Sequence, residues 1–295
     1  MQRRTFITLA ATTAALTALP ALARTTGEET MSEPKTGFAP INGLEMYYEI
    51  HGSGEPLLML HGGIGAHEQF GPNLAELART RQVIVAHMQG HGFTKDIDRP
   101  YSYPQFGDDV AALLDHLGFV SVDILGYSLG AGIALRMAIQ HPQKVKRLII
   151  VSGTMSMDGS YPEVVAAFPA MVQNAAQISA GVAASPLATM YPDVDWETAF
   201  RKTGELESED WDWTDEIGGI TAPALLVFAD ADSVRGEHMV AMYQKFGGFQ
   251  RDAGLDGSLR PASRLAIISG KTHYNILETP EVSAIAGKFL AEVSA

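Results

Sequence analysis

Short apolar runs alternate with amphipathic stretches along most of the chain. The runs have the length of buried strands, and helical spacing of apolar residues fills the gaps between them. Runs are found at 57–60, 82–87, 122–126, 145–151, 223–228 and 264–268, and helical spacing near 66–79, 104–117 and 129–140. This alternation predicts an α/β fold, a mostly parallel sheet with helices on both faces. Ligands of such sheets bind beyond the carboxyl ends of the strands.

The alternation breaks between residues 153 and 220. This stretch is rich in Met, Trp, Tyr and Phe, and Val164, Phe168 and Met171 show helical spacing within it. It is too long for a loop without structure of its own. We therefore predict a helical lid at 153–220, inserted into a core formed by residues 40–152 and 221–295. Most of its large apolar side chains are expected to pack the lid, and a minority to line a pocket.

The first 23 residues predict an export signal. Arg3 and Arg4 precede an uncharged, Ala-rich stretch, and Ala21-Leu22-Ala23 is typical of a cleavage site. The segment resembles a twin-arginine signal, so we expect transient contact with that export machinery and a periplasmic or secreted protein. Translation from Met31 is the alternative. Residues 24–39 are polar and predict a flexible lead-in.

Composition narrows the classes of partner. The formal net charge of −13 argues against nucleic acid and anionic membrane surfaces. The apolar stretch of the signal is too weak for a membrane span, so no stable membrane association is expected. With no cysteine, the chain has no disulfide, no thiol nucleophile and no thiolate metal site. At 295 residues it can build one large core plus an insertion, and the pattern favours no particular oligomeric state.

One motif carries most of the chemical information. Gly126-Tyr127-Ser128-Leu129-Gly130 follows an apolar run and leads into a helical pattern, which is the strand-turn-helix context of a nucleophile elbow. Small flanking residues leave room for a sharp, strained turn at Ser128, and the helix that follows directs unpaired N–H groups at an anion on its hydroxyl. We therefore predict Ser128 as a nucleophile. An ordinary strand-to-helix connection is the alternative.

A serine hydroxyl needs a histidine to take its proton and an acid to hold that histidine. In this architecture the two follow the serine in the order acid, then histidine. Asp230 and Asp232 come just after the run at 223–228, and His273 comes just after the run at 264–268. We predict His273 as the base. The strand period of 2 sends both aspartates to the same side, so spacing leaves the acid open between them.

The oxyanion of the tetrahedral intermediate needs two N–H donors. Leu129, the residue after the nucleophile, is expected to supply one, and the loop after an early strand the other. His61-Gly62-Gly63 forms that loop. We place the second donor at Gly63, because glycine lets the backbone come close to a substrate oxygen. Ile64 is the alternative.

These segments together resemble the lidded α/β-hydrolase-fold enzymes, a group with esterases, haloperoxidase-like perhydrolases, lactonases and carbon–carbon bond hydrolases. The resemblance spans residues 41–295 and rests on His61–Gly63, Gln89–Thr94, Gly126–Gly130, Ala229–Asp232 and Thr272-His273. In that family the acid is usually the second of a D-x-D segment, which implies Asp232. Two segments depart from the family pattern: His87–Thr94 lacks the usual D-x-R, and Tyr274-Asn275 replaces an apolar residue and a proline.

Other motifs favour plainer interpretations. His87 and His91 have the spacing of zinc-binding helices, but Gly90 and Gly92 predict a turn there. We therefore expect His61, His67, His87 and His91 to be hydrogen-bonded loop residues, and we expect no metal. The glycine patterns lack the spacing of a nucleotide site, and no cofactor is expected.

The sequence thus predicts a carboxylesterase-like serine hydrolase that cleaves an ester-type bond in a small, largely apolar molecule through an acyl-enzyme. Lactonase, perhydrolase and carbon–carbon hydrolase activities use the same triad and stay as alternatives. Ser128 argues against haloalkane dehalogenases and epoxide hydrolases, whose nucleophile is an aspartate. A non-catalytic binding or sensor protein on the same scaffold is the alternative from a different class, and a complete triad speaks against it.

Overall fold

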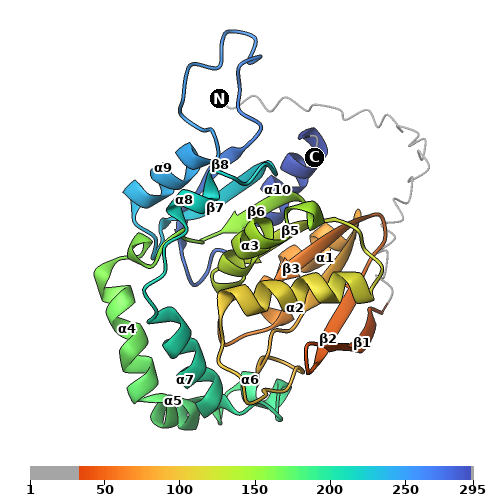
Figure 1. The fold of residues 1–295 in the computed structure, drawn as a ribbon, viewed down its shortest axis with the longest axis vertical. Helices are drawn as coiled ribbons and strands as arrows, with labels where there is room; N and C mark the ends of the chain where they lie inside the picture. Colours follow the sequence, from red (N-terminus) through yellow and green to blue (C-terminus); the bar gives the residue numbers. More distant parts are fainter. Residues whose placement is uncertain (1–32, 294–295) are drawn as a thin grey trace, which may run out of the picture. The chain divides into compact units, whose positions relative to one another are not determined.

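An eight-stranded sheet organises the part of the chain that this computed structural model describes, residues 33–293 (Figure 1). The predicted signal at 1–23 lies outside these residues. The strand order is β1-β2-β4-β3-β5-β6-β7-β8, and every pair from β4 to β8 is parallel. The strands are β1 (Lys35–Ile41), β2 (Leu44–His51), β3 (Glu55–Leu60), β4 (Arg81–Ala86), β5 (Val122–Tyr127), β6 (Val145–Val151), β7 (Ala224–Ala231) and β8 (Arg264–Thr272). The predicted α/β fold is confirmed.

Helices cover both faces of the sheet, which explains why its central strands are continuous apolar runs. In β3, Leu58 and Leu60 face a cluster that includes α2 (Tyr103–His116), α3 (Leu129–Gln140) and α9 (Gly236–Lys245). Leu57 and Met59 alternate with them and face the opposite cluster, with α1 (Pro72–Ala78) and α10 (Glu281–Glu292). The period-2 alternation of a strand thus divides its side chains between two cores.

A helical insert separates β6 from β7. The insert begins with a short 3-10 turn, η3 (Met157–Gly159). Its helices are α4 (Pro162–Gln173), α5 (Ala175–Val182), α6 (Pro186–Met190), α7 (Trp196–Glu207) and α8 (Thr214–Ile217). Figure 1 shows α4, α5 and α7 grouped together at the lower left, clear of the sheet. Lys202 of α7 ties the insert to the core, because its Nζ donates to Asp96 Oδ2 at 2.6 Å and to the carbonyls of Ile97 and Arg99 at 2.8 and 2.9 Å.

The flexible lead-in predicted for 24–39 is wrong from Lys35 onward. Residues 35–41 form β1, which pairs with β2 from Lys35 opposite Ile50 to Ile41 opposite Leu44. Asn42 and Gly43 join the two strands with φ of 47° and 88°, as a two-residue hairpin turn requires. The segment is polar because it is an edge strand with one exposed face. The rest of that predicted lead-in, residues 24–32, lies outside the described residues.

A buried asparagine fixes the chain segment that follows β8. The side-chain amide of Asn73, in α1, donates to the carbonyls of Phe70, Leu277 and Thr279 at 3.1, 2.8 and 3.1 Å. Its oxygen accepts from the N–H of Ser283 at 2.8 Å. A buried amide whose N–H groups and oxygen all have hydrogen-bond partners is a rigid connection.

Over residues 33–293, none of the helices has the length and apolar character that a bilayer span needs.

Candidate active site

Ser128 lies at the sharp turn between β5 and α3. Its φ of 52° and ψ of −117° are strained for a residue with a side chain. Any side chain at Gly126 would collide with the carbonyl oxygen of Gly130, and one at Gly130 would collide with that of Leu60. The glycines of the motif therefore let α3 start directly against the ends of β3 and β5. Ser128 is left half-buried at the carboxyl edge of the sheet.

The structure brings the side chains of Ser128, His273 and Asp232 into one hydrogen-bonded line. Oγ of Ser128 lies 3.0 Å from Nε2 of His273. Nδ1 of the same ring lies 2.9 Å from Oδ1 of Asp232. Ser128 follows β5, His273 follows β8 and Asp232 follows β7, so the carboxyl ends of three parallel strands in the same half of the sheet position them.

The two candidate acids have different surroundings. The ladder between β7 and β8 shifts register between Ala229 and Ala231, which breaks the simple alternation. Asp230 is exposed and accepts from the N–H groups of Gly270 and Lys271 at 2.9 and 3.2 Å. Asp232 is buried and faces His273. Of the two, only Asp232 can hold the imidazole.

Hydrogen bonds keep Asp232 ionised despite its burial. Burial opposes the charged form, but the hydrogen bond and charge of His273 outweigh it, together with donors from Ser152 and Ala229, and the pKa of Asp232 is lowered. The Ser152 hydroxyl and the Ala229 N–H donate to Oδ2 at 2.6 and 2.9 Å. The imidazole therefore meets a carboxylate that is fixed from the other side.

Two more hydroxyl groups hold the histidine. Oγ of Ser233 lies 2.8 Å from Nδ1 of His273, next to the carboxylate. The Tyr127 hydroxyl donates to the carbonyl of His273 at 2.8 Å. Tyr127 is the variable second residue of the G-x-S-x-G motif. Sequence patterns gave no sign of these roles, because both depend on contacts between distant segments.

Gly63 and Leu129 lie on the wall of the cavity that contains Ser128. Neither N–H has a partner in the loops and side chains that the structure describes, so both are available to a substrate oxygen. Gln69 shapes this loop, because its Oε1 accepts from Gly62 at 2.8 Å and its Nε2 donates to the Gly63 carbonyl at 3.3 Å. Ile64, the alternative donor, lines the same cavity with a φ of 61°.

The cavity at Ser128 has a volume of about 580 Å³, the size of a small-molecule site. Both the core and the helical insert line it. Among the residues that the insert contributes are Ser160, Glu163, Val164, Ala167, Phe168 and Met171 from α4 and the turn before it, Thr203 and Glu207 from α7, and Trp211. The expectation that only a minority of the large apolar side chains reach the pocket is confirmed: Met155 and Trp213, for example, are buried in the core.

A carboxyl group also lines this largely apolar cavity, and sequence reasoning missed it. Glu207 is the last residue of α7, and its Oε1 accepts a hydrogen bond of 2.8 Å from the hydroxyl of Tyr103. Burial raises the pKa of Glu207 to about 7, although the Tyr103 hydrogen bond and the charge of His273 act in the other direction. The group therefore changes charge close to neutral pH.

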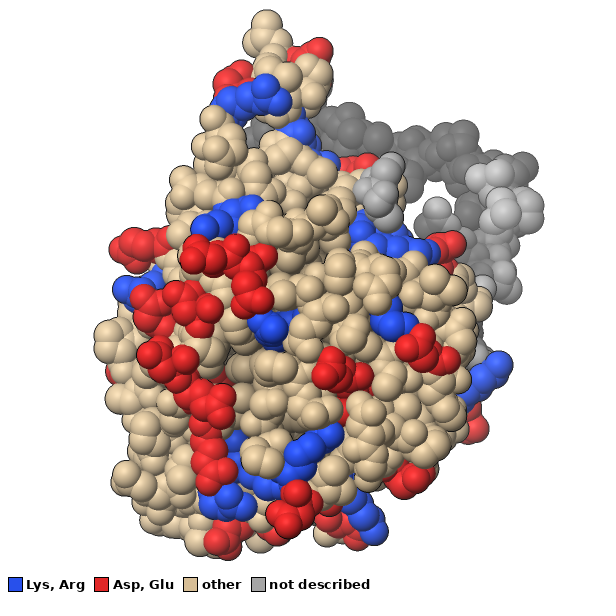
Figure 2. Space-filling view, in the orientation of Figure 1, with Lys and Arg blue, Asp and Glu red and all other residues tan. Residues whose placement is uncertain are grey.

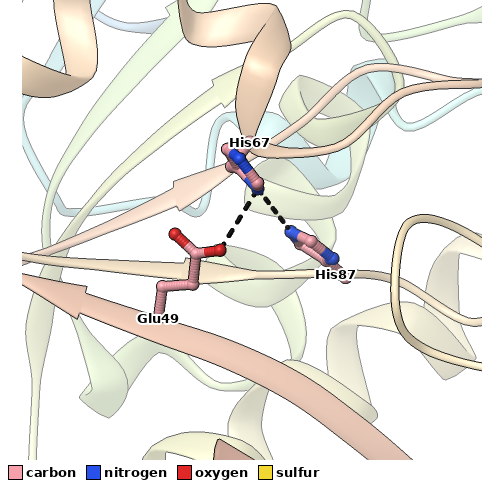
Figure 3. A group of neighbouring side chains, drawn as sticks. All are labelled: Glu49, His67 and His87. Carbon is pink, nitrogen blue, oxygen red and sulfur yellow. Dashed lines mark hydrogen bonds and ion pairs between the residues drawn. The ribbon is translucent and has the colours of Figure 1, made fainter. Parts of the chain in front are cut away.

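A second polar cluster lies near β2. Figure 3 shows Glu49, His67 and His87 pointing toward one another, with Nδ1 of His67 lying 3.2 Å from Glu49 Oε1 and 3.3 Å from His87 Nε2. However, the N–H of Phe93 donates to Nδ1 of His87 at 3.0 Å. Neutral His87 then carries its proton on Nε2, the atom that would have to bind a metal. The proton arrangement favours a hydrogen-bonded His87, and we assign no metal to this group.

The neighbouring histidines are hydrogen-bonded loop residues, as expected. Nδ1 of His61 lies 2.7 Å from the Gly62 carbonyl, and Nδ1 of His91 lies 2.9 Å from that of Gln89. Burial lowers the pKa of His61 to about 4 and that of His91 to about 3. Both rings are therefore neutral at neutral pH and support the loops as hydrogen-bonding groups.

Known proteins resemble this chain in sequence and structure. The family model described as the alpha/beta hydrolase fold matches residues 55–204. A 2-hydroxymuconate semialdehyde hydrolase from Pseudomonas sp. (strain CF600) is 38% identical over 104 residues, which are 34% of this chain and only 37% of that protein.

Two solved structures share the architecture. The enol-lactonase from Burkholderia xenovorans LB400 has a TM-score of 0.68 and 19% identity, over 86% of this chain and 100% of that one. The carboxylesterase CesB from Bacillus subtilis has a TM-score of 0.69 and 18% identity, over 88% and 92%. At such identities the likeness shows the fold alone. Together with the family match over residues 55–204, it leads to one conclusion: the chain belongs to the α/β-hydrolase fold family.

Proposed function

We propose that the protein is a serine esterase that acts on small molecules. The observation that carries the proposal is the hydrogen-bonded line from Asp232 through His273 to Ser128, with distances of 2.9 and 3.0 Å, on the wall of a cavity of about 580 Å³. A binding protein has no need of such a line. Apolar side chains of the insert favour an apolar acyl or alcohol group.

The chemistry follows from the positions of the side chains. Nε2 of His273 takes the Ser128 proton as Oγ attacks the ester carbonyl, and Asp232 stabilises the imidazolium that forms. The N–H groups of Leu129 and Gly63 hold the oxyanion. His273 then gives the proton to the leaving alcohol. Water attacks the acyl-enzyme in the second half-reaction, with His273 again as the base.

The lining of the cavity favours an ester over the substrate of the carbon–carbon hydrolases. The relative from Pseudomonas is named for a muconate semialdehyde, which carries a carboxylate. Within residues 33–293, neither lysine nor arginine lines the cavity, and Glu207 adds a carboxyl group to it. A carboxylate substrate would find no counter-charge there. Lactone hydrolysis and perhydrolysis stay as second candidates on the same triad.

The test is a substrate screen with a labelling control. We expect the purified protein to hydrolyse p-nitrophenyl esters, and a fluorophosphonate probe to label it at Ser128. The Ser128→Ala variant should show neither. A lactone assay and a peroxide-dependent assay run beside the esters. No turnover and no labelling of the wild type would identify a binding protein, and faster turnover of lactones would replace the esterase reading.

A further inference from the structure

We propose that Glu207, Tyr103 and Trp211 form a subsite for an organic cation, an ammonium group carried by the ester substrate. The inference rests on the proposed esterase function and specifies which class of ester the cavity favours. It adds a charged group to the small, largely apolar substrate that the sequence predicts.

The carboxyl group of Glu207 has one oxygen free for a ligand. Its Oε1 accepts from the Tyr103 hydroxyl at 2.8 Å, whereas its Oε2 accepts no hydrogen bond from any residue in the described range. Glu207 lines the same cavity as Ser128 and His273. An unpaired oxygen on a half-buried carboxylate can bind a donor or a cation, and such a partner would offset the cost of its partial burial.

Tyr103, which contacts the Glu207 carboxyl group, packs against a second aromatic ring on the cavity wall, that of Trp211. Tyr103 and Trp211 both line the cavity, and their ring centroids are 5.3 Å apart with an angle of 62° between the planes. Trp213 stacks on Trp211 from 4.3 Å and, buried itself, holds it in place. Electron-rich ring faces attract ammonium groups, most strongly where water is excluded. A carboxylate that shares a cavity wall with two such rings is suited to a methylated or primary ammonium.

The charges around the cavity agree with this assignment. Glu163, Glu207 and His273 are the titratable acids and bases on its wall, apart from tyrosines. The basic residues of α7 are already paired, Arg201 with Glu205 at 2.9 Å and Lys202 with Asp96 at 2.6 Å. Figure 2 shows more acidic than basic side chains on the side of the view that carries the helical insert. The electrostatic field of the surface charges around the insert therefore does not oppose the approach of a cation to the cavity.

A purely structural role for the Tyr103–Glu207 pair does not explain why the acceptor is a carboxyl group, whereas a cation subsite does. The pair joins α2 of the core to α7 of the insert, but Lys202 already makes three hydrogen bonds across the same junction. Glutamine would supply the same acceptor to Tyr103 without the cost of a charge. The carboxyl group adds a feature that anchoring does not need, and Glu207→Gln separates the two roles.

The experiment compares two esters of the same shape, butyrylcholine and 3,3-dimethylbutyl butyrate, which differ only in a charged nitrogen for a carbon. At pH 8 we expect the wild type to have a kcat/KM about 10-fold higher for the cation. In Glu207→Gln this ratio should fall to about 1 or below. Glu205→Gln removes the same charge from the exposed side of α7 and should keep the wild-type ratio.

A binding measurement separates failure of the subsite from failure of the esterase function. Calorimetry with choline and with 3,3-dimethyl-1-butanol, on Ser128→Ala, should show tighter binding of choline. Adding Glu207→Gln should remove that preference. If esters are hydrolysed but the two esters or the two alcohols are treated alike, the cation subsite is wrong. If choline is preferred but no ester reacts, the subsite stands and the esterase function is wrong.

Discussion

The hydroxyl of Ser152 donates a hydrogen bond of 2.6 Å to Oδ2 of Asp232, the carboxylate oxygen that faces away from His273. Ser152 follows β6 with a φ of 50°, an unfavourable conformation for serine. This backbone conformation places a buried donor next to the acid. The strand between those of Ser128 and Asp232 thus also contributes a side chain to the site.

Removing this donor should weaken catalysis without removing the triad. A hydrogen bond to a charged group contributes about 1.5–3 kcal/mol, so we expect Ser152→Ala to lower kcat about 10-fold or more. Ser269→Ala is the matched control, because Ser269 donates to Asp230 at 3.1 Å. Steady-state kinetics on a p-nitrophenyl ester measure both variants. Equal losses in the two would contradict the proposed role of Ser152.

The triad itself is tested by four substitutions. Ser128→Ala and His273→Ala should each lower kcat by about 10⁴-fold or more, since members of a triad act as a unit. Asp232→Asn should approach this loss, because the wrong imidazole tautomer would face the serine. Asp230→Asn should stay close to the wild type. A larger loss in Asp230→Asn than in Asp232→Asn would move the acid and leave the other assignments standing.

Two aromatic residues of the insert should behave differently on truncation. Phe168 is half-buried and lines the cavity, so Phe168→Ala should shift the preference toward longer acyl chains. Trp213 is buried against Tyr103 and Trp211, so Trp213→Ala should lower the free energy of unfolding by about 3–5 kcal/mol. Urea unfolding and kcat/KM from acetate to octanoate esters check the two. A shift in chain-length preference from Trp213→Ala alone would reverse the assignment.

Glu207 makes the stability of the protein depend on pH. Burial raises its pKa from an ordinary 4.5 to about 7, so the folded protein holds this proton more tightly than the unfolded chain. The stability from this group is fully present below pH 4.5 and is lost as the pH rises through about 7. Glu207→Gln should therefore raise Tm at pH 8 and change it much less at pH 5. An equal change at both values would show that Glu207 titrates normally.

The predicted export signal at residues 1–23 lies outside the described residues, so export stays a proposal. We propose that Arg3 and Arg4 direct the chain to the twin-arginine route. The double change Arg3→Lys, Arg4→Lys should leave esterase activity in the cytoplasm, and the exported protein should begin at Arg24. Fractionation and N-terminal sequencing measure these outcomes. An N-terminus at Met31 with an unchanged location would favour the alternative start.

The sheet was largely predictable because its central strands are buried on both faces. Apolar runs such as 122–126 are stable only in a strand that is covered on both faces. The glycines around Ser128 fit only a close turn. The edge strand β1 was missed because one of its faces is exposed and its sequence is polar. The Asn42-Gly43 pair was the available sign of a hairpin there.

The finer features of the site depend on tertiary contacts. The register shift in β7 separates Asp230 from Asp232, and a strand period alone gives no indication of it. Glu207 occurs in a helix with other acids at 197 and 205, and only its meeting with Tyr103, 104 residues earlier, distinguishes it. Polar residues that act through distant partners leave no local pattern in a single sequence.

Because β8 is the last strand in the chain and lies at the edge of the sheet, the triad is completed late in protein synthesis. His273 follows this strand, whereas Ser128 and Asp232 belong to strands that precede it in the chain. A chain still emerging from the ribosome can hold its nucleophile and its acid in place and yet lack the base. Detachment of this one edge in the finished protein would have the same effect while the other strands stay paired. The proposed triad is therefore complete only when the last strand of the sheet has docked.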